Sequence, residues 1–98
     1  MINRIVKMEF QPDKVNSFRE LFSRQQQQIR NFPGCLHLEL WEHPASGNTF
    51  FTFSKWDSEI ALEKYRNSDL FRETWAATKI LFAAKPAAWS VLPTVVLP

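Results

Sequence analysis

The segment from Thr49 to Trp56 constrains the fold of this chain more than any other, because it is apolar on both faces. Read as a β-strand, it places Phe50 on one side and Phe51 and Phe53 on the other. A strand of this kind must be covered on both sides. We expect the chain's own helices to cover one side and a second copy of the protein to cover the other.

Three other segments have the pattern of β-strands. Residues 2–10 alternate, so that one face carries Ile2, Arg4, Val6, Met8 and Phe10 and the other carries Asn3, Ile5, Lys7 and Glu9. Residues 35–43 place Leu36, Leu38 and Leu40 on one face and Cys35, His37, Glu39 and Trp41 on the other. Residues 87–92 form the last strand. Because Pro93 has no backbone donor for a central strand, residues 92–98 are expected to form a tail that packs on the partner subunit.

Helical periodicity predicts the elements between these strands. The first helix runs from Pro12 to about Asn31, with apolar residues three and four apart. The second begins at a cap formed by Asp57 or Ser58 and ends near Lys85. It is interrupted and capped again at residues 67–69, so we expect it in two parts.

The order of these elements is β-α-β-β-α-β. Two right-handed crossovers around a hairpin predict an antiparallel four-stranded sheet with helices on one face. We therefore assign residues 1–98 to a single α+β domain, a ferredoxin-like plait with a split second helix. The uncovered face of such a sheet would be a large apolar patch, which favours a homodimer packed sheet to sheet.

Composition narrows the class of protein. The chain has 98 residues, a net charge of +2 and a single cysteine, Cys35. This length suits one domain, and one cysteine allows no internal disulfide. The charge is too small to indicate a nucleic-acid or membrane partner. No apolar run reaches the roughly 20 residues of a membrane span, and no signal-peptide pattern precedes the first strand. We expect a cytoplasmic protein.

Three motifs mark the junctions between elements. They are Asn31-Phe32-Pro33-Gly34-Cys35, Phe53-Ser54-Lys55-Trp56-Asp57-Ser58 and Asn67-Ser68-Asp69-Leu70-Phe71. In combination they resemble the antibiotic biosynthesis monooxygenase superfamily, the dimeric α/β-barrel proteins, over nearly the whole chain. The resemblance implies this fold and a homodimer. For activity it implies cofactor-independent oxygenation of polycyclic phenols, heme degradation, or a role without assigned chemistry.

The heme-degrading branch of the superfamily is similar to the chain only in part. Asn3 matches the Asn that the branch carries near the start of the first strand. Tyr65 stands where its Trp is expected, and Trp75 stands where its His is expected. Because a Trp side chain has no lone pair for iron, heme chemistry of that kind is not expected.

The remaining candidate site is polar and aromatic. The sequence contains no metal-ligand pattern, P-loop, GxGxxG or CxxC, so we predict no metal and no cofactor. His43 is expected in solvent, and Cys35 as a small buried filler. The resemblance and the aromatic content predict a cleft between helices and sheet that binds a small aromatic molecule. We predict Asn3, Tyr65 and Trp75 as its catalytic residues and Phe22, His37, Phe71 and Trp89 as its substrate-binding residues.

These predicted site residues, together with the family resemblance, favour a cofactor-independent monooxygenase for a phenol or hydroquinone. An electron-rich phenolate can reduce oxygen directly, so the protein need only orient it, stabilise its charge and exclude water. A non-catalytic homodimer that binds a ligand or serves a structural role is the alternative. RNA-recognition domains share the element order, but Ser46 and Asn48 depart from their aromatic motif and the first strand offers no ring for a base. RNA binding is therefore not expected.

Overall fold

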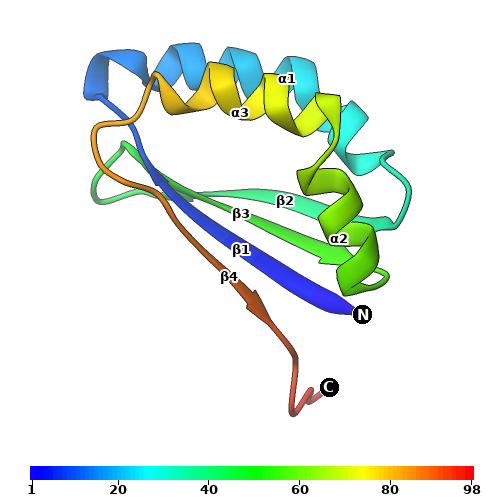
Figure 1. Cartoon of the computed structure of the whole chain (residues 1–98). Helices are drawn as coiled ribbons and strands as arrows, with labels where there is room; N and C mark the ends of the chain where they lie inside the picture. Colours follow the sequence, from blue (N-terminus) through cyan, green and yellow to red (C-terminus); the bar gives the residue numbers. More distant parts are fainter.

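The computed structural model describes all 98 residues and arranges the helices over one side of a four-stranded sheet (Figure 1). In chain order the elements are β1 (Ile2–Glu9), the 3-10 turn η1 (Pro12–Lys14), α1 (Val15–Arg30), β2 (Cys35–His43), β3 (Thr49–Trp56), α2 (Glu59–Arg66), α3 (Asp69–Lys79) and β4 (Ala87–Val91). This order confirms the predicted α+β ferredoxin-like fold with its split second helix.

The sheet has the order β2-β3-β1-β4, and each neighbouring pair of strands is antiparallel. Ile5 of β1 lies opposite Phe53 of β3 on one side and Trp89 of β4 on the other. Phe53 in turn lies opposite Glu39 of β2. Because side chains alternate along a strand, this whole row belongs to one face of the sheet, and Arg4 belongs to the other.

The face that the helices cover holds two groups of buried side chains. Ile2, Cys35, Trp56 and Leu62 form the group beside α2. Met8, Phe10, Phe18 and Phe50 form the group under α1, where the rings of Phe10 and Phe18 stack with centroids 4.1 Å apart. The two groups lie at opposite ends of β1 and β3. The middle of this face, between the two groups, is where the cavity described below is found.

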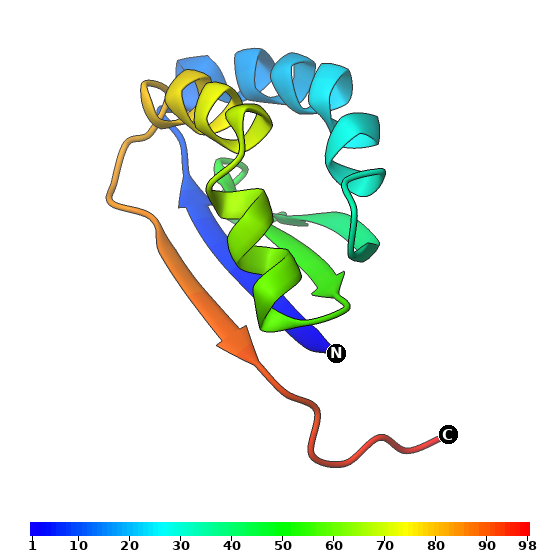
Figure 2. The same cartoon turned by 45° about the vertical axis from the view of Figure 1, so that its right-hand side comes forward.

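A serine caps the start of each part of the second helix, and the cap at Ser68 lies at the break between them. The Ser58 hydroxyl accepts a hydrogen bond from the Ala61 amide at 3.1 Å, and the Ser68 hydroxyl accepts one from the Phe71 amide at 3.1 Å. Each bond satisfies a backbone donor that the first turn of a helix leaves free. The chain therefore starts a new helix at Asp69, and α2 runs in a different direction from α3 (Figures 1 and 2).

The turn between α1 and β2 depends on Gly34. Its φ of +90° is strained for any residue with a side chain, and a Cβ at this position would lie 2.4 Å from the Cβ of Ala61. The turn thus passes directly against α2. Glycine allows this close approach, which anchors α2 over the end of the sheet.

Two helix boundaries and the ends of two strands differ from the prediction. β1 ends at Glu9, one residue earlier than expected. α3 ends at Lys79 instead of near Lys85, because Phe82 forms a bridge with Phe10 and packs on its ring at 5.4 Å. The first helix begins with the separate turn η1 and ends at Arg30. β4 ends at Val91, one residue earlier than expected.

The side chain of Cys35 lies on the helix-covered face, whereas the sequence pattern placed it with His37. A bulge between these two residues shifts the register of β2 and reverses the alternation there. Leu36 is left 44% exposed as a result. Cys35 is buried as predicted, and its burial raises the pKa of the thiol, which keeps it protonated.

The opposite face of the sheet carries no helix (Figures 1 and 2). Trp41 stacks on Phe53 there at 5.2 Å, yet Trp41 and Trp89 are 41% and 48% exposed. The tail beyond β4 is also exposed. This face is the one that the prediction assigned to a partner subunit. None of the helices has the length and apolar character needed to cross a membrane.

Candidate functional site

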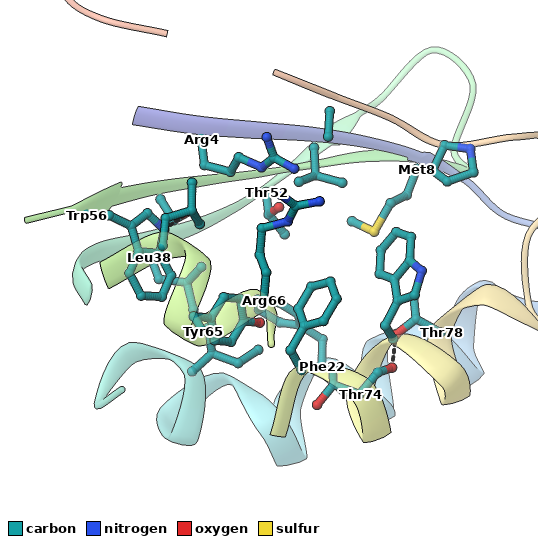
Figure 3. A pocket seen from close by; sticks show the side chains of 18 of the residues that line it. Arg4, Met8, Phe22, Leu38, Thr52, Trp56, Tyr65, Arg66, Thr74 and Thr78 are labelled. Carbon is teal, nitrogen blue, oxygen red and sulfur yellow. Dashed lines mark hydrogen bonds between the residues drawn. The ribbon is translucent and has the colours of Figure 1, made fainter. Parts of the chain in front are cut away.

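A cavity of about 330 Å³ lies between the sheet and the helices (Figure 3). Of its 20 lining residues, 13 are hydrophobic. Met8 and Phe18 come from one buried group, and Trp56 and Leu62 from the other, so the cavity fills the middle of the covered face. Its size and its apolar lining with a few polar groups are typical of sites for small organic ligands.

One wall of the cavity is a continuous row of aromatic rings. Tyr65 stacks on Trp56 at 4.9 Å and meets Phe71 edge to face at 5.2 Å. Phe71 and Trp75 then lie nearly parallel, with an interplanar angle of 9° and centroids 5.8 Å apart. Helix α2 supplies the tyrosine and α3 the last two rings. The serine cap between these helices therefore determines how the two halves of the wall meet.

The Tyr65 hydroxyl points towards the middle of the cavity in Figure 3 and has no hydrogen-bond partner in the protein. Burial is the main cause of a raised pKa for this phenol, and a charge on Cys35 would raise it further. Tyr65 thus remains a neutral donor at ordinary pH. It is suited to donate a hydrogen bond to a ligand oxygen and unsuited to act as a base.

Helix α3 places two further kinds of group at the cavity. The indole N–H of Trp75 makes no hydrogen bond within the protein, so it is a second free donor. The Thr78 hydroxyl is already used, because it donates to the Thr74 carbonyl oxygen at 2.7 Å. The Thr74 hydroxyl is buried and has no hydrogen-bond partner within the protein.

Two arginines give the cavity a positive charge. Arg4 projects into it from β1 and Arg66 from α2 (Figure 3). The pKa of Arg4 is lowered, first by burial and then by the charge of Arg66, while Glu63 opposes the shift. The two guanidinium groups are therefore close enough to repel each other.

The structure brings four of the seven predicted site residues together. Phe22, Tyr65, Phe71 and Trp75 all line the cavity. Asn3, His37 and Trp89 do not line it, because they lie on the uncovered face of the sheet. There Asn3 is opposite Lys55 and Val91, His37 is opposite Lys55, and Trp89 is opposite Ile5.

Arg4 occupies the place that the prediction gave to Asn3. Adjacent residues of a strand point to opposite faces, so only one of the two can reach the cavity. The sequence carried a signal for Arg4, since it is the one charged residue on the face of Ile2, Val6 and Met8. Arg66 was also missed, and its only signal is its position next to Tyr65 at the end of α2.

The histidines do not fit the ligation of a heme iron in this cavity. His37 lies on the opposite face of the sheet and contacts Glu39, and His43 lies at the end of β2. Neither lines the cavity. Trp75 occupies the wall at the position where the resemblance would require a histidine, and its indole cannot coordinate iron. No group of three or more His, Cys, Asp or Glu side chains is positioned to hold a metal ion.

The model of the antibiotic biosynthesis monooxygenase family matches residues 1–77, which include the whole cavity wall of α2 and α3 up to Trp75. The chain belongs to the antibiotic biosynthesis monooxygenase family. No curated protein matches the sequence.

Solved structures share the family fold over nearly the whole chain. A crystal structure of an antibiotic biosynthesis monooxygenase superimposes with a TM-score of 0.90 at 15% identity, covering 97% of this chain and 100% of that one. Rv0793 from Mycobacterium tuberculosis gives 0.87 at 24% identity, covering 99% and 98%. A mutant of SnoaB, a cofactor-independent oxygenase from Streptomyces nogalater, gives 0.88 at 14% identity, covering 99% and 96%. At these identities the likeness concerns the fold.

Proposed function

We propose that this protein is a cofactor-independent monooxygenase that acts on an aromatic phenol or hydroquinone. The observation that carries the proposal is the aromatic cavity of about 330 Å³ in which the Tyr65 hydroxyl and the Trp75 indole N–H have no protein partner. Family membership and the structural likeness to SnoaB, a cofactor-independent oxygenase, support the reaction class.

The chemistry is carried by the substrate. Its phenolate transfers electrons to O₂ and a C–O bond forms at an electron-rich carbon. The substrate loses two hydrogens and gains one oxygen, and the second oxygen atom leaves as water. The substrate thus supplies all four electrons, and the balance requires no other reductant.

The protein's contribution is to position the substrate and stabilise its charge. Phe22, Phe71 and Trp75 present ring faces and edges that suit a flat aromatic molecule. Tyr65 donates a hydrogen bond to the reacting oxygen, which favours the phenolate over the neutral phenol, and Trp75 donates one to another oxygen of the substrate and contributes to binding. A preorganised donor of this kind is worth about 2.7–4 kcal/mol of the reaction barrier.

Oxygen uptake by metal-free protein tests the proposal across a panel of anthrones, naphthols and hydroquinones. Tyr65→Phe should lower kcat on the order of a hundredfold or more, because it removes one donor to the reacting oxygen. Trp75→Phe should mainly raise KM, because the ring remains while the N–H is lost. Trp41→Phe is the matched control, since Trp41 lies on the uncovered face and does not line the cavity.

The position of Asn3 provides a decisive comparison. Asn3→Ala should leave turnover unchanged, because Asn3 points away from the cavity. Loss of turnover in Asn3→Ala with normal turnover in Tyr65→Phe would instead place the reaction at the opposite face. If no compound in the panel is turned over above the buffer rate, the non-catalytic ligand-binding homodimer becomes the better proposal.

We also propose that two copies of the chain pack through the uncovered face of the sheet, with residues 92–98 lying on the partner. The exposed rings of Trp41 and Trp89 and the exposed tail support this proposal. A stable interface of this kind buries on the order of 1,200–2,000 Å² or more in total. Light scattering at micromolar concentration should give twice the chain mass, and Trp89→Asp should shift it towards the monomer. A monomer mass for the unaltered protein would refute the dimer.

A further inference from the structure

The two arginines of the cavity have donors that the protein does not use. A guanidinium group carries five N–H donors. Arg4 has one side-chain hydrogen bond, from Nη1 to the Ser90 hydroxyl at 3.1 Å. Arg66 has one as well, from Nη1 to the carboxylate of Glu63 at 2.8 Å. Most of the donors on both groups therefore remain available to a ligand.

The charges at this end of the cavity do not balance. Glu63 is the only carboxylate whose charge acts on Arg4, and it is already paired with Arg66. The strand residues beside Arg4 on the covered face, Thr52 and Ser54, are neutral, and no acidic residue lines the cavity. One positive charge at this end of the cavity is thus left without a counter-ion.

Such an arrangement is unfavourable without a bound anion. Partial burial weakens the hydration of the Arg4 guanidinium, and the like charge of Arg66 repels it. A carboxylate between them would relieve the repulsion and accept paired N–H bonds, since the planar fork of arginine matches the two oxygens of a carboxylate. A neutral ligand would relieve neither the weakened hydration of Arg4 nor the repulsion between the two charges.

We propose that Arg4 and Arg66 form an anion-binding subsite and that the ligand of this cavity is an aromatic carboxylic acid with a phenolic hydroxyl. The acid is then the substrate class of the proposed monooxygenase. Its oxygenation rests on that proposed function, whereas its binding does not. The carboxylate lies between the two arginines, and the aromatic ring extends between Phe22, Phe71 and Trp75. A phenolate alone shares the negative charge but provides one oxygen where the arginines can engage two.

Three matched probes separate these chemistries: a hydroxynaphthoic acid, its methyl ester and the corresponding naphthol. Binding can be measured without oxygen by quenching of tryptophan fluorescence and by calorimetry. We expect the acid to bind on the order of tenfold more tightly than the ester, because only the acid forms charge-assisted hydrogen bonds with the arginines. Added salt should weaken binding of the acid and leave that of the ester unchanged.

Arg4→Met should remove the preference for the acid, because it keeps the apolar stem and loses the charge. Arg24→Met is the control, since Arg24 is exposed and lies outside the cavity. If Arg4→Met does not fold, the salt dependence of the unaltered protein decides the matter alone. Equal affinity for acid and ester, or a preference that survives Arg4→Met, would overturn the proposal.

Oxygen uptake distinguishes this proposal from the proposed reaction. Tight, salt-sensitive binding of the acid without oxygen uptake from any probe would uphold the anion subsite and count against the monooxygenase. Oxygen uptake from the naphthol, with no tighter binding of the acid, would support the monooxygenase and overturn the anion subsite.

Discussion

Tyr65 is the only tyrosine of the chain, so the protonation of the cavity's main donor can be observed directly. Tyrosinate formation raises the ultraviolet absorbance near the red edge of the protein band, and no other residue contributes that signal. Because burial raises the pKa of Tyr65, we expect no tyrosinate in the folded protein as pH passes through 10, the usual value for an exposed phenol.

The raised pKa of Tyr65 must also make the free energy of unfolding depend on pH. Above pH 10 the unfolded chain has lost this proton and the folded chain retains it, so the unfolded state binds fewer protons and stability falls as pH rises. Below that pH the group contributes no pH dependence of this kind. If the folded pKa remains above the measured range, the loss is about 1.2 kcal/mol between pH 10.5 and 11.5.

Urea unfolding of the parent and of Tyr65→Phe isolates this contribution, since all other titrating groups are common to both proteins. The free energy of unfolding of the parent should decline relative to the variant by about this amount over that interval. A tyrosinate signal with a midpoint near 10 in the folded protein would refute the reasoning. So would a stability difference that is the same at both pH values.

Three further predictions follow from single contacts. Thr74→Val should raise the free energy of unfolding by on the order of 1 kcal/mol, because it removes a buried hydroxyl without a partner. Thr78→Val, its matched control, should lower it, because that hydroxyl is bonded; urea unfolding in which both variants move in the same direction would contradict this account. Gly34→Ala should destabilise by roughly 2–4 kcal/mol, through a strained positive φ and contact with Ala61, and a thermal melt that matches the parent would show that the turn can relax. Hemin titration should give no spectrum of axial nitrogen ligation, whereas Trp75→His should gain one if the position corresponds to the family's histidine; ligation in the parent would mean that another residue reaches the iron.

Most of the fold could be predicted from local signals. The apolar pattern of residues 49–56 predicted a strand over this segment, and β3 has the same bounds, Thr49–Trp56. Asp57 or Ser58 and residues 67–69 predicted the starts of α2 and α3, and in the structure the Ser58 and Ser68 hydroxyls each accept a hydrogen bond from the first turn. These features depend on residues close together in the sequence.

The errors lie where distant residues compete with local preference. Leu81 and Phe82 continue the helical period of α3, but the ring of Phe82 is better buried against Phe10, so the helix ends at Lys79. The alternation of β2 is reversed at Cys35 by a bulge, which a pattern of period two cannot reveal. Both outcomes depend on packing between elements.

The candidate site shows the same division. The sequence by itself determined that Asn3 and Arg4 point to opposite faces, since that follows from the geometry of any strand. It also placed Tyr65, Phe71 and Trp75 on the two parts of one broken helix. Only the tertiary structure decided that the helices cover the face of Arg4 and leave a cavity between two buried groups. Which residues meet there depends on how the sheet, α2 and α3 pack, and no single segment of the sequence contains that information.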